Sequence, residues 1–186
     1  STPLSAAIRA AIFLSSFSAM VLFLFLLLCY ASFGITNMIS DSYYKLNKIS
    51  NGKGNIFSIT MFIVGLCMMI CLLDTGRGVQ SFAFGGGAGL LFVSIAPNFK
   101  DVDVRTVHKA GAILSGLCCI GWCISVNWIP TILISILYLI YLLRNGANTR
   151  IAKLFHLNNT KGLSHWLYWA EVFAFLDTFV TYWSIY

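Results

Sequence analysis

Long apolar runs are the feature that most limits what this chain can fold into. No charged residue occurs between Arg9 and Asp41, and most of that stretch consists of aliphatic and aromatic side chains. A helix crosses the hydrocarbon layer of a bilayer with roughly 20 apolar residues, so this run is long enough. Over all 186 residues, 59% are hydrophobic and 10% are charged, whereas soluble domains carry about 25% charged residues. Because one water-soluble core cannot hide so much apolar surface, the sequence predicts a membrane protein.

Six apolar segments alternate with short polar connections along the chain. At roughly 20 residues for each span, the length leaves no room for a separate soluble domain. We therefore predict an all-α fold, a polytopic integral membrane six-helix bundle that forms one transmembrane domain over residues 1–186. The predicted spans cover residues 10–35, 56–73, 82–99, 110–126, 128–143 and 165–186.

Positive charges gather on one side of this arrangement. The first, third and fifth connections hold ten lysines and arginines, whereas the opposite side holds only Arg9 and Arg77. By the positive-inside rule, the basic side faces the cytoplasm and both termini face outward; we expect a bacterial inner (plasma) membrane. The basic side is expected to meet anionic lipid head groups, so the net charge of +6 requires no nucleic acid. The ten residues are Lys45, Lys48, Lys53, Lys100, Arg105, Lys109, Arg144, Arg150, Lys153 and Lys161.

Small residues recur at helical spacing in the third and fourth predicted spans. Gly85 and Gly89 form a GxxxG pattern, and Ala112 and Gly116 repeat small residues at the same interval. Small side chains four residues apart let two membrane helices approach closely. We expect these four positions to pack helices within the chain, with a dimer face as the alternative.

Two carboxylates lie within the last predicted span, Glu171 and Asp177. At ~1.5 Å of rise per residue, Asp177 lies ~16 Å beyond Trp166, near the centre of the bilayer. A charged carboxylate there costs at least ~2.5 kcal/mol, so it should face the bundle, be paired or be protonated. Thr178 and Thr181 are the nearby hydrogen-bond partners. Both acids are candidates for an ion or proton site, and a purely structural role is the alternative for Asp177.

A polar cluster is predicted at the cytoplasmic ends of the helices. Glu171 lies ~7–8 Å below that surface and is expected to pair with His108, Lys109 or Arg144, while His165 opens the same helix. Histidines and carboxylates also suit zinc, and a metal site for lipid hydrolysis is an alternative use of the cluster. No HxxxH or HxxE spacing places two ligands on one helix face, so we expect neither a metal nor a cofactor.

One segment carries a resemblance to known proteins. Residues 89–100 read GLLFVSIAPNFK, and Val107, His108 and Ala110 follow. This segment, roughly a quarter of the chain with its surroundings, resembles uncharacterised small six-span membrane proteins of bacterial and phage genomes, and more distantly those of the Frag/DRAM type. The matching residues are Pro97, Lys100 and His108. The resemblance implies a six-helix fold and little about activity.

Three classes of function follow from these features. The first is a non-catalytic membrane protein that binds lipid, a protein partner or a second copy of itself, or serves as a subunit of a membrane assembly. The lack of catalytic spacing favours it, so we do not expect an enzyme. The second is a proton- or cation-linked transporter or channel that uses Asp177. The third is an interfacial lipid hydrolase with a histidine and carboxylate metal site.

Overall fold

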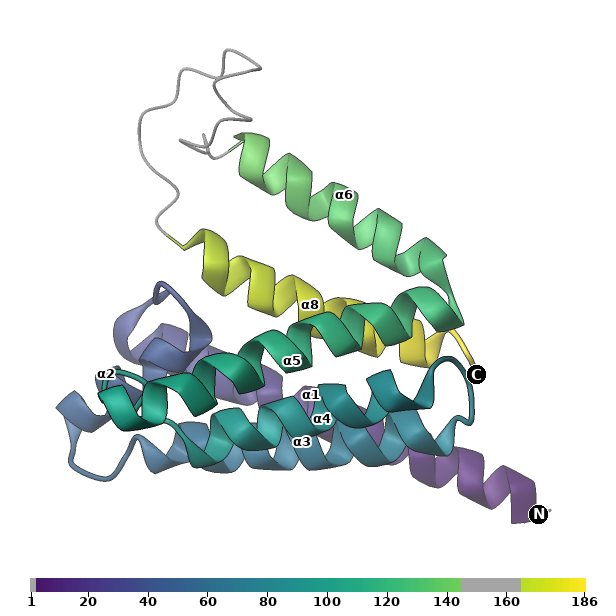
Figure 1. The fold of residues 1–186 in the computed structure, drawn as a ribbon, viewed down its shortest axis with the longest axis horizontal. Coiled ribbons are helices and arrows are strands. Elements are labelled where there is room, and N and C mark those ends of the chain that lie inside the picture. The colour runs from purple at the N-terminus through teal and green to yellow at the C-terminus, as the bar shows by residue number, and fades with distance from the viewer. Residues whose placement is uncertain (1–2, 145–164) are drawn as a thin grey trace.

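The computed structural model describes residues 3–144 and 165–186, and throughout these ranges it contains helices and no strand (Figure 1). The all-α prediction is confirmed for this part of the chain. The fifth connection, with Arg150, Lys153 and Lys161, lies outside it. The helices are α1 (Pro3–Phe33), a single 3-10 turn η1 (Ile39–Asp41), α2 (Ser42–Ile49), α3 (Asn55–Asp74), α4 (Gln80–Ile95), α5 (Val102–Val126), α6 (Trp128–Arg144) and α8 (Trp166–Trp183).

Three of the described helices are long and apolar enough to cross a membrane. They comprise most of α1, over Ala6–Phe33, and the whole of α3 and α5. Two shorter helices, α4 and α6, are also apolar. The chain therefore has the helices of a membrane protein, as its composition predicts.

The predicted spans overlap the observed helices, but several boundaries differ. The third span was expected to reach residue 99, whereas α4 ends at Ile95 because Pro97 disfavours helical geometry in the residue before it. The fourth was expected to begin at residue 110, whereas α5 begins at Val102. Its first two turns are polar, and Asp103 in the first turn interacts favourably with the helix dipole.

The first connection contains a helix that the hydropathy pattern does not reveal. Gly34, with φ of +76°, ends α1 and donates its N–H to the Tyr30 carbonyl at 2.9 Å, as glycine often does just past a helix. The chain then forms η1 and α2. This short helix is polar except for the side that buries Leu46 against the bundle, so a search for apolar runs misses it.

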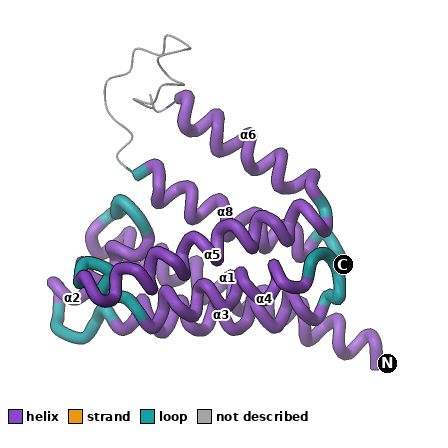
Figure 2. Tube along the Cα trace, in the orientation of Figure 1, coloured by secondary structure: helices purple, strands orange, loops and turns teal. Residues whose placement is uncertain are grey.

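Glycines bring α4 close to both of its neighbours. Gly87 of α4 lies so near Gly65 of α3 that a Cβ added at Gly87 would be 2.8 Å from the Gly65 carbonyl oxygen. On the other side, a Cβ at Gly89 would be 2.5 Å from the carbonyl oxygen of Gly111 in α5. Small residues allow such backbone contact. Helices α3, α4 and α5 therefore form the tightly packed part of the fold (Figure 2).

The residues of α5 that contact α4 are not the ones that the sequence pattern predicts. A side chain added at Gly85 would meet the sulfur of Cys118, so Gly85 and Gly89 both lie against α5. The α5 residue that faces Gly89 is Gly111, whereas Gly116 has open space beside it. Gly116 and Ala112 instead line a half-open apolar pocket. The expected interval of four residues is present in α5, but Gly111, and not Gly116, is the glycine that meets α4.

The remaining helices surround this packed unit. Helix α1 lies against α3, and α8 lies against α5 and α6. Both chain termini lie at the end of the molecule that also holds the α3–α4 and α5–α6 connections (Figure 1). At this end, the fully buried Trp122 donates its indole N–H to the Arg77 carbonyl at 3.1 Å. The opposite end holds α2 and the start of α8, and it contains most of the predicted site residues.

Candidate functional sites

The segment between α1 and α2, residues 34–41, is tied to the start of α8 by three hydrogen bonds. The His165 Nδ1–H donates to the Thr36 carbonyl at 2.8 Å, and the Tyr168 N–H donates to the Asn37 carbonyl at 3.0 Å. The Ile39 N–H donates to Glu171 Oε2 at 2.6 Å. We expected Glu171 to pair with a basic side chain, but it accepts a hydrogen bond from the backbone. The carboxylate therefore holds the 34–41 segment in place.

His108 ties the same segment to α4 and α5. Its ring is buried, with Nδ1 2.8 Å from the Ala96 carbonyl oxygen and Nε2 3.0 Å from Ser40 Oγ. A carbonyl can only accept, so Nδ1 carries the hydrogen, and in the neutral ring Nε2 accepts from the Ser40 hydroxyl. The Phe99 ring lies 4.9 Å from the imidazole, centroid to centroid. His108 is thus a buried connecting residue.

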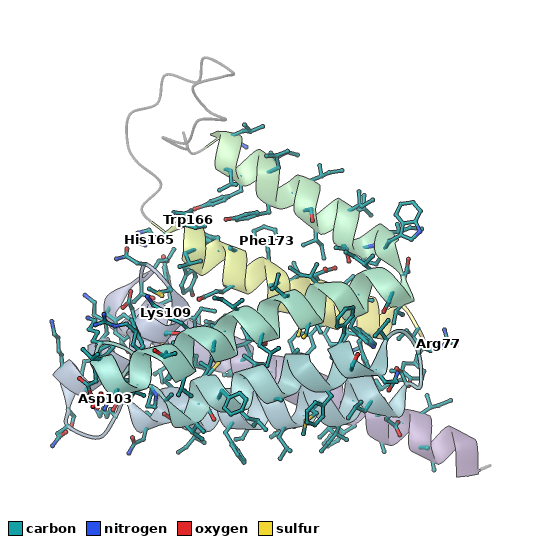
Figure 3. The ribbon with its side chains drawn as sticks, in the orientation of Figure 1. Arg77, Asp103, Lys109, His165, Trp166 and Phe173 are labelled. Atoms are coloured by element: carbon teal, nitrogen blue, oxygen red, sulfur yellow. The ribbon has the colours of Figure 1, made fainter. Side chains whose placement is uncertain are left out.

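The predicted polar cluster is only partly assembled. His108, His165 and Glu171 all bond to residues 34–41, each to a different atom. Lys109 and Arg144 are exposed. Lys109 lies on α5, whereas His165 lies at the start of α8 (Figure 3). Among the described residues, no group of three or more His, Cys, Asp or Glu side chains is placed to hold a metal ion. The geometry therefore gives the lipid-hydrolase alternative no support.

A half-open apolar pocket of about 100 Å³ lies between α3, α4, α5 and α8. Ser40 and Glu171 line it at the end near α2, and Thr178 lines it deeper in the bundle. Most of the remaining wall is apolar, including Met61 and Phe175. Glu171 therefore fastens the 34–41 segment across one end of an apolar cavity.

A basic pocket of about 410 Å³ lies at the α2 end of the molecule. Lys45 and Lys48 of α2, Lys100 before α5 and His165 before α8 all line it. Tyr44 shapes the wall. Its hydroxyl oxygen accepts from the Lys100 N–H at 2.8 Å, and the Lys100 ammonium lies 4.3 Å from its ring centroid. We call this space the basic pocket.

The phenol of Tyr44 can also contribute to binding in the basic pocket. Burial raises the pKa of Tyr44 above its usual value, so the hydroxyl stays protonated at neutral pH. Because its oxygen accepts from the Lys100 backbone, its own hydrogen is directed elsewhere. The pocket also contains Asp41. Three lysines and one histidine nonetheless outnumber this one carboxylate, so the pocket suits an anion.

Asp177 lies in a crevice between α6 and α8 of about 180 Å³. Its side chain is only 4% exposed, and Oδ1 accepts hydrogen bonds from Thr131 of α6 at 3.1 Å and Thr181 of α8 at 3.4 Å. Thr181 was an expected partner. Thr178 was also expected, but its hydroxyl donates to the Ala174 carbonyl at 3.0 Å. Asp177 and Glu171 therefore line different spaces, one on each side of α8.

Comparisons with protein-family models, with curated proteins and with solved structures found no match to this chain.

Proposed function

We propose that this chain is a six-span integral membrane protein that acts without catalysis and binds anionic lipid head groups at its basic end. The basic pocket is the observation that carries this proposal. Lys45 and Lys48 lie 52 to 55 residues before Lys100 in the sequence, and the fold brings all three to one pocket. A phosphate group offers oxygens to several ammonium groups at once, so it matches this arrangement.

Six spans fit the lengths and order of the described helices. Helices α4 and α6 have 16 and 17 residues, which corresponds to ~24–26 Å at ~1.5 Å per residue. The hydrocarbon layer is ~30 Å thick, so each needs only a turn of flanking chain or a local thinning of the bilayer. Helix α8 has 18 residues and completes the set despite its two acids. Six crossings also agree with both termini lying at one end of the molecule.

The proposed orientation places the basic pocket where anionic lipids are found. The end that contains α2 carries the lysines of the first and third connections and is cytoplasmic by the positive-inside rule. The cytoplasmic leaflet carries a negative surface potential, which contributes about 1 kcal/mol for each nearby lysine or arginine. The opposite end carries Arg77 and the chain termini. The pocket therefore lies at head-group level, where it would hold a lipid phosphate. A protein partner or a second copy of the chain could bind to the same face of the molecule.

The test compares two triple variants in lipid nanodiscs. Replacing Lys45, Lys48 and Lys100 by glutamine should weaken binding of an added anionic lipid, phosphatidylglycerol, about a hundredfold, because about 3 kcal/mol is lost with three charges. The matched control replaces Lys53, Lys109 and Arg144, which are exposed but do not line the pocket. Native mass spectrometry measures lipid occupancy for both. Equal loss in the two variants would show that charge alone, and no pocket, attracts the lipid.

A second candidate function is proton- or cation-linked transport. One observation favours it, since a crevice reaches the buried carboxylate of Asp177. Intramembrane carboxylates mark ion pathways in many membrane proteins. Transport requires flux across liposomes that Asp177→Asn abolishes while the protein still folds. Flux that survives this change would leave Asp177 with a structural role.

A further inference from the structure

We infer that the crevice between α6 and α8 binds a small lipophilic amine, held as its ammonium ion with the charge at Asp177. The inference deepens the second candidate function by naming a ligand class, and it does not depend on the basic pocket. It stands on three properties of the crevice: the two hydrogen bonds that join its walls, the carboxylate at one end and the aromatic rings at the other.

Two hydrogen bonds fix α6 against α8 at the ends of the crevice. At one end, the Thr131 hydroxyl donates to Asp177 at 3.1 Å. At the other, the Tyr138 hydroxyl donates to the Trp166 carbonyl at 2.9 Å. Between these contacts α8 presents the small residues Ala170 and Ala174 to the space. The crevice is thus a half-open site whose two ends are fixed by hydrogen bonds and whose lining includes Ile120 of α5.

Within residues 3–144 and 165–186, the carboxylate end of the crevice has no positive side chain in its lining. Asp177 accepts hydrogen bonds from two threonine hydroxyls, and no lysine, arginine or histidine is among the residues that line the crevice. A buried carboxylate needs a proton or a positive charge to offset its desolvation. A ligand ammonium supplies that charge, and the Ser135 hydroxyl on the α6 wall is an additional acceptor for its hydrogens.

The opposite end of the crevice suits an apolar, preferably aromatic, body. The rings of Tyr138 and Phe173 lie 5.5 Å apart, centroid to centroid, and both line the space. Figure 3 shows Phe173 on the side of α8 that faces α6. Phe173 precedes Asp177 by one helical turn, which is ~6 Å along the axis. A cavity of about 150 Å³ accommodates a benzene ring, so 180 Å³ has room for a single ring.

Other cations fit the crevice less well. A metal ion such as Ca²⁺ takes six to eight oxygen ligands, whereas Ile120, Ile134 and Phe173 make much of this wall apolar. An amine head group of a phospholipid stays at the membrane surface, while Asp177 lies ~16 Å beyond Trp166. A lipophilic amine dissolves in the bilayer and reaches the crevice laterally.

Three small probes of one shape test the inference on the full chain in phosphatidylcholine nanodiscs. Benzylamine carries a positive charge at pH 7, benzyl alcohol is neutral and benzoate is negative. Isothermal titration calorimetry should show binding of benzylamine about tenfold or more tighter than benzyl alcohol, as expected for one charge-assisted hydrogen bond in a desolvated site. Benzoate should not bind.

Two substitutions locate the site. Asp177→Asn keeps the acceptor for Thr131 but removes the charge, so benzylamine affinity should fall to that of benzyl alcohol. Ala170→Leu fills the crevice without touching the carboxylate and should weaken both probes, which keeps the test decisive if Asp177→Asn fails to fold. The matched control is Glu171→Gln, which changes the other acid of α8 and lines a different cavity. It should leave benzylamine binding unchanged.

Several results would overturn the inference. Equal affinities of the native chain for benzylamine and benzyl alcohol would show a general apolar crevice. A loss of binding in Glu171→Gln as large as that in Asp177→Asn would place the site elsewhere. Competition by phosphatidylethanolamine in the nanodisc would assign the charge to a lipid head group. Amine binding without any flux would contradict transport but uphold the site, so the two proposals fail separately.

Discussion

His108 links three parts of the chain, and its replacement should destabilise the fold. In the His108→Ala variant, the Ala96 carbonyl and the Ser40 hydroxyl both lose their partner within the bundle. A buried polar group left without a hydrogen bond costs about 1–3 kcal/mol. We expect the midpoint of thermal unfolding in detergent, followed by tryptophan fluorescence, to fall clearly. His165→Ala removes a less buried ring with one bond to Thr36 and should cost less; an equal or larger effect would contradict this role for His108.

The sequence identifies the residues of these sites better than it identifies their partners. The two acids of α8 stand out because carboxylates are rare in apolar runs, and their separation by six residues predicts different faces of the helix. Thr131, which bonds Asp177 from α6, gives no such signal, since a threonine in a span is common. The sequence also does not predict the basic pocket. In the sequence, its three lysines belong to separate connections: Lys45 and Lys48 to one, and Lys100 to another. Only the folded chain brings α2 against the segment before α5.

The glycines of α4 and α5 allow a direct test of how these helices pack. Gly89→Leu would place its Cβ 2.5 Å from the Gly111 carbonyl oxygen and the Ser115 nitrogen, so the two backbones must separate. Such overpacking costs typically 1–3 kcal/mol, and more where backbone is involved. Gly116→Leu meets open space and gains up to about 1 kcal/mol of helix propensity. We expect the yield of folded protein in detergent, measured by size-exclusion chromatography, to collapse for the first variant only.

If instead Gly116→Leu abolished the yield of folded protein and Gly89→Leu did not, α5 would face α4 with Gly116 and not with Gly111. The intervals in the sequence do not decide between the two faces, since both glycines lie within small-residue patterns. At the level of elements, apolar runs predict where the long helices are because lipid or core must cover them. They do not predict α2, which is polar and short, or the early start of α5, whose first two turns extend beyond the apolar stretch.

At the scale of the whole molecule, the two proposed activities use different parts of the fold. One lies at the α2 end of the packed α3–α4–α5 unit, and the other lies at the more loosely attached α6. Head-group binding uses the connections at the α2 end, which His108 of α5 and Glu171 of α8 hold in fixed positions. Amine binding uses the contact between α6 and α8, where side chains and not glycine backbones meet. Head-group binding, unlike amine binding, requires the helices to cross the bilayer in one particular orientation.

That orientation is tested by labelling single introduced cysteines on intact cells. Lys48 and Arg77 are exposed and belong to connections at opposite ends of the bundle; Figure 3 labels Arg77 at the end where Figure 1 marks both termini. If the side rich in lysine and arginine is cytoplasmic, a membrane-impermeant maleimide should modify Arg77→Cys from outside and Lys48→Cys only after the membrane is opened. The unsubstituted chain is the control, because five of its six cysteines are buried and Cys118 is half-buried. Labelling of Lys48→Cys on intact cells would place the basic pocket outside, where the cytoplasmic surface potential cannot supply the attraction on which head-group binding depends.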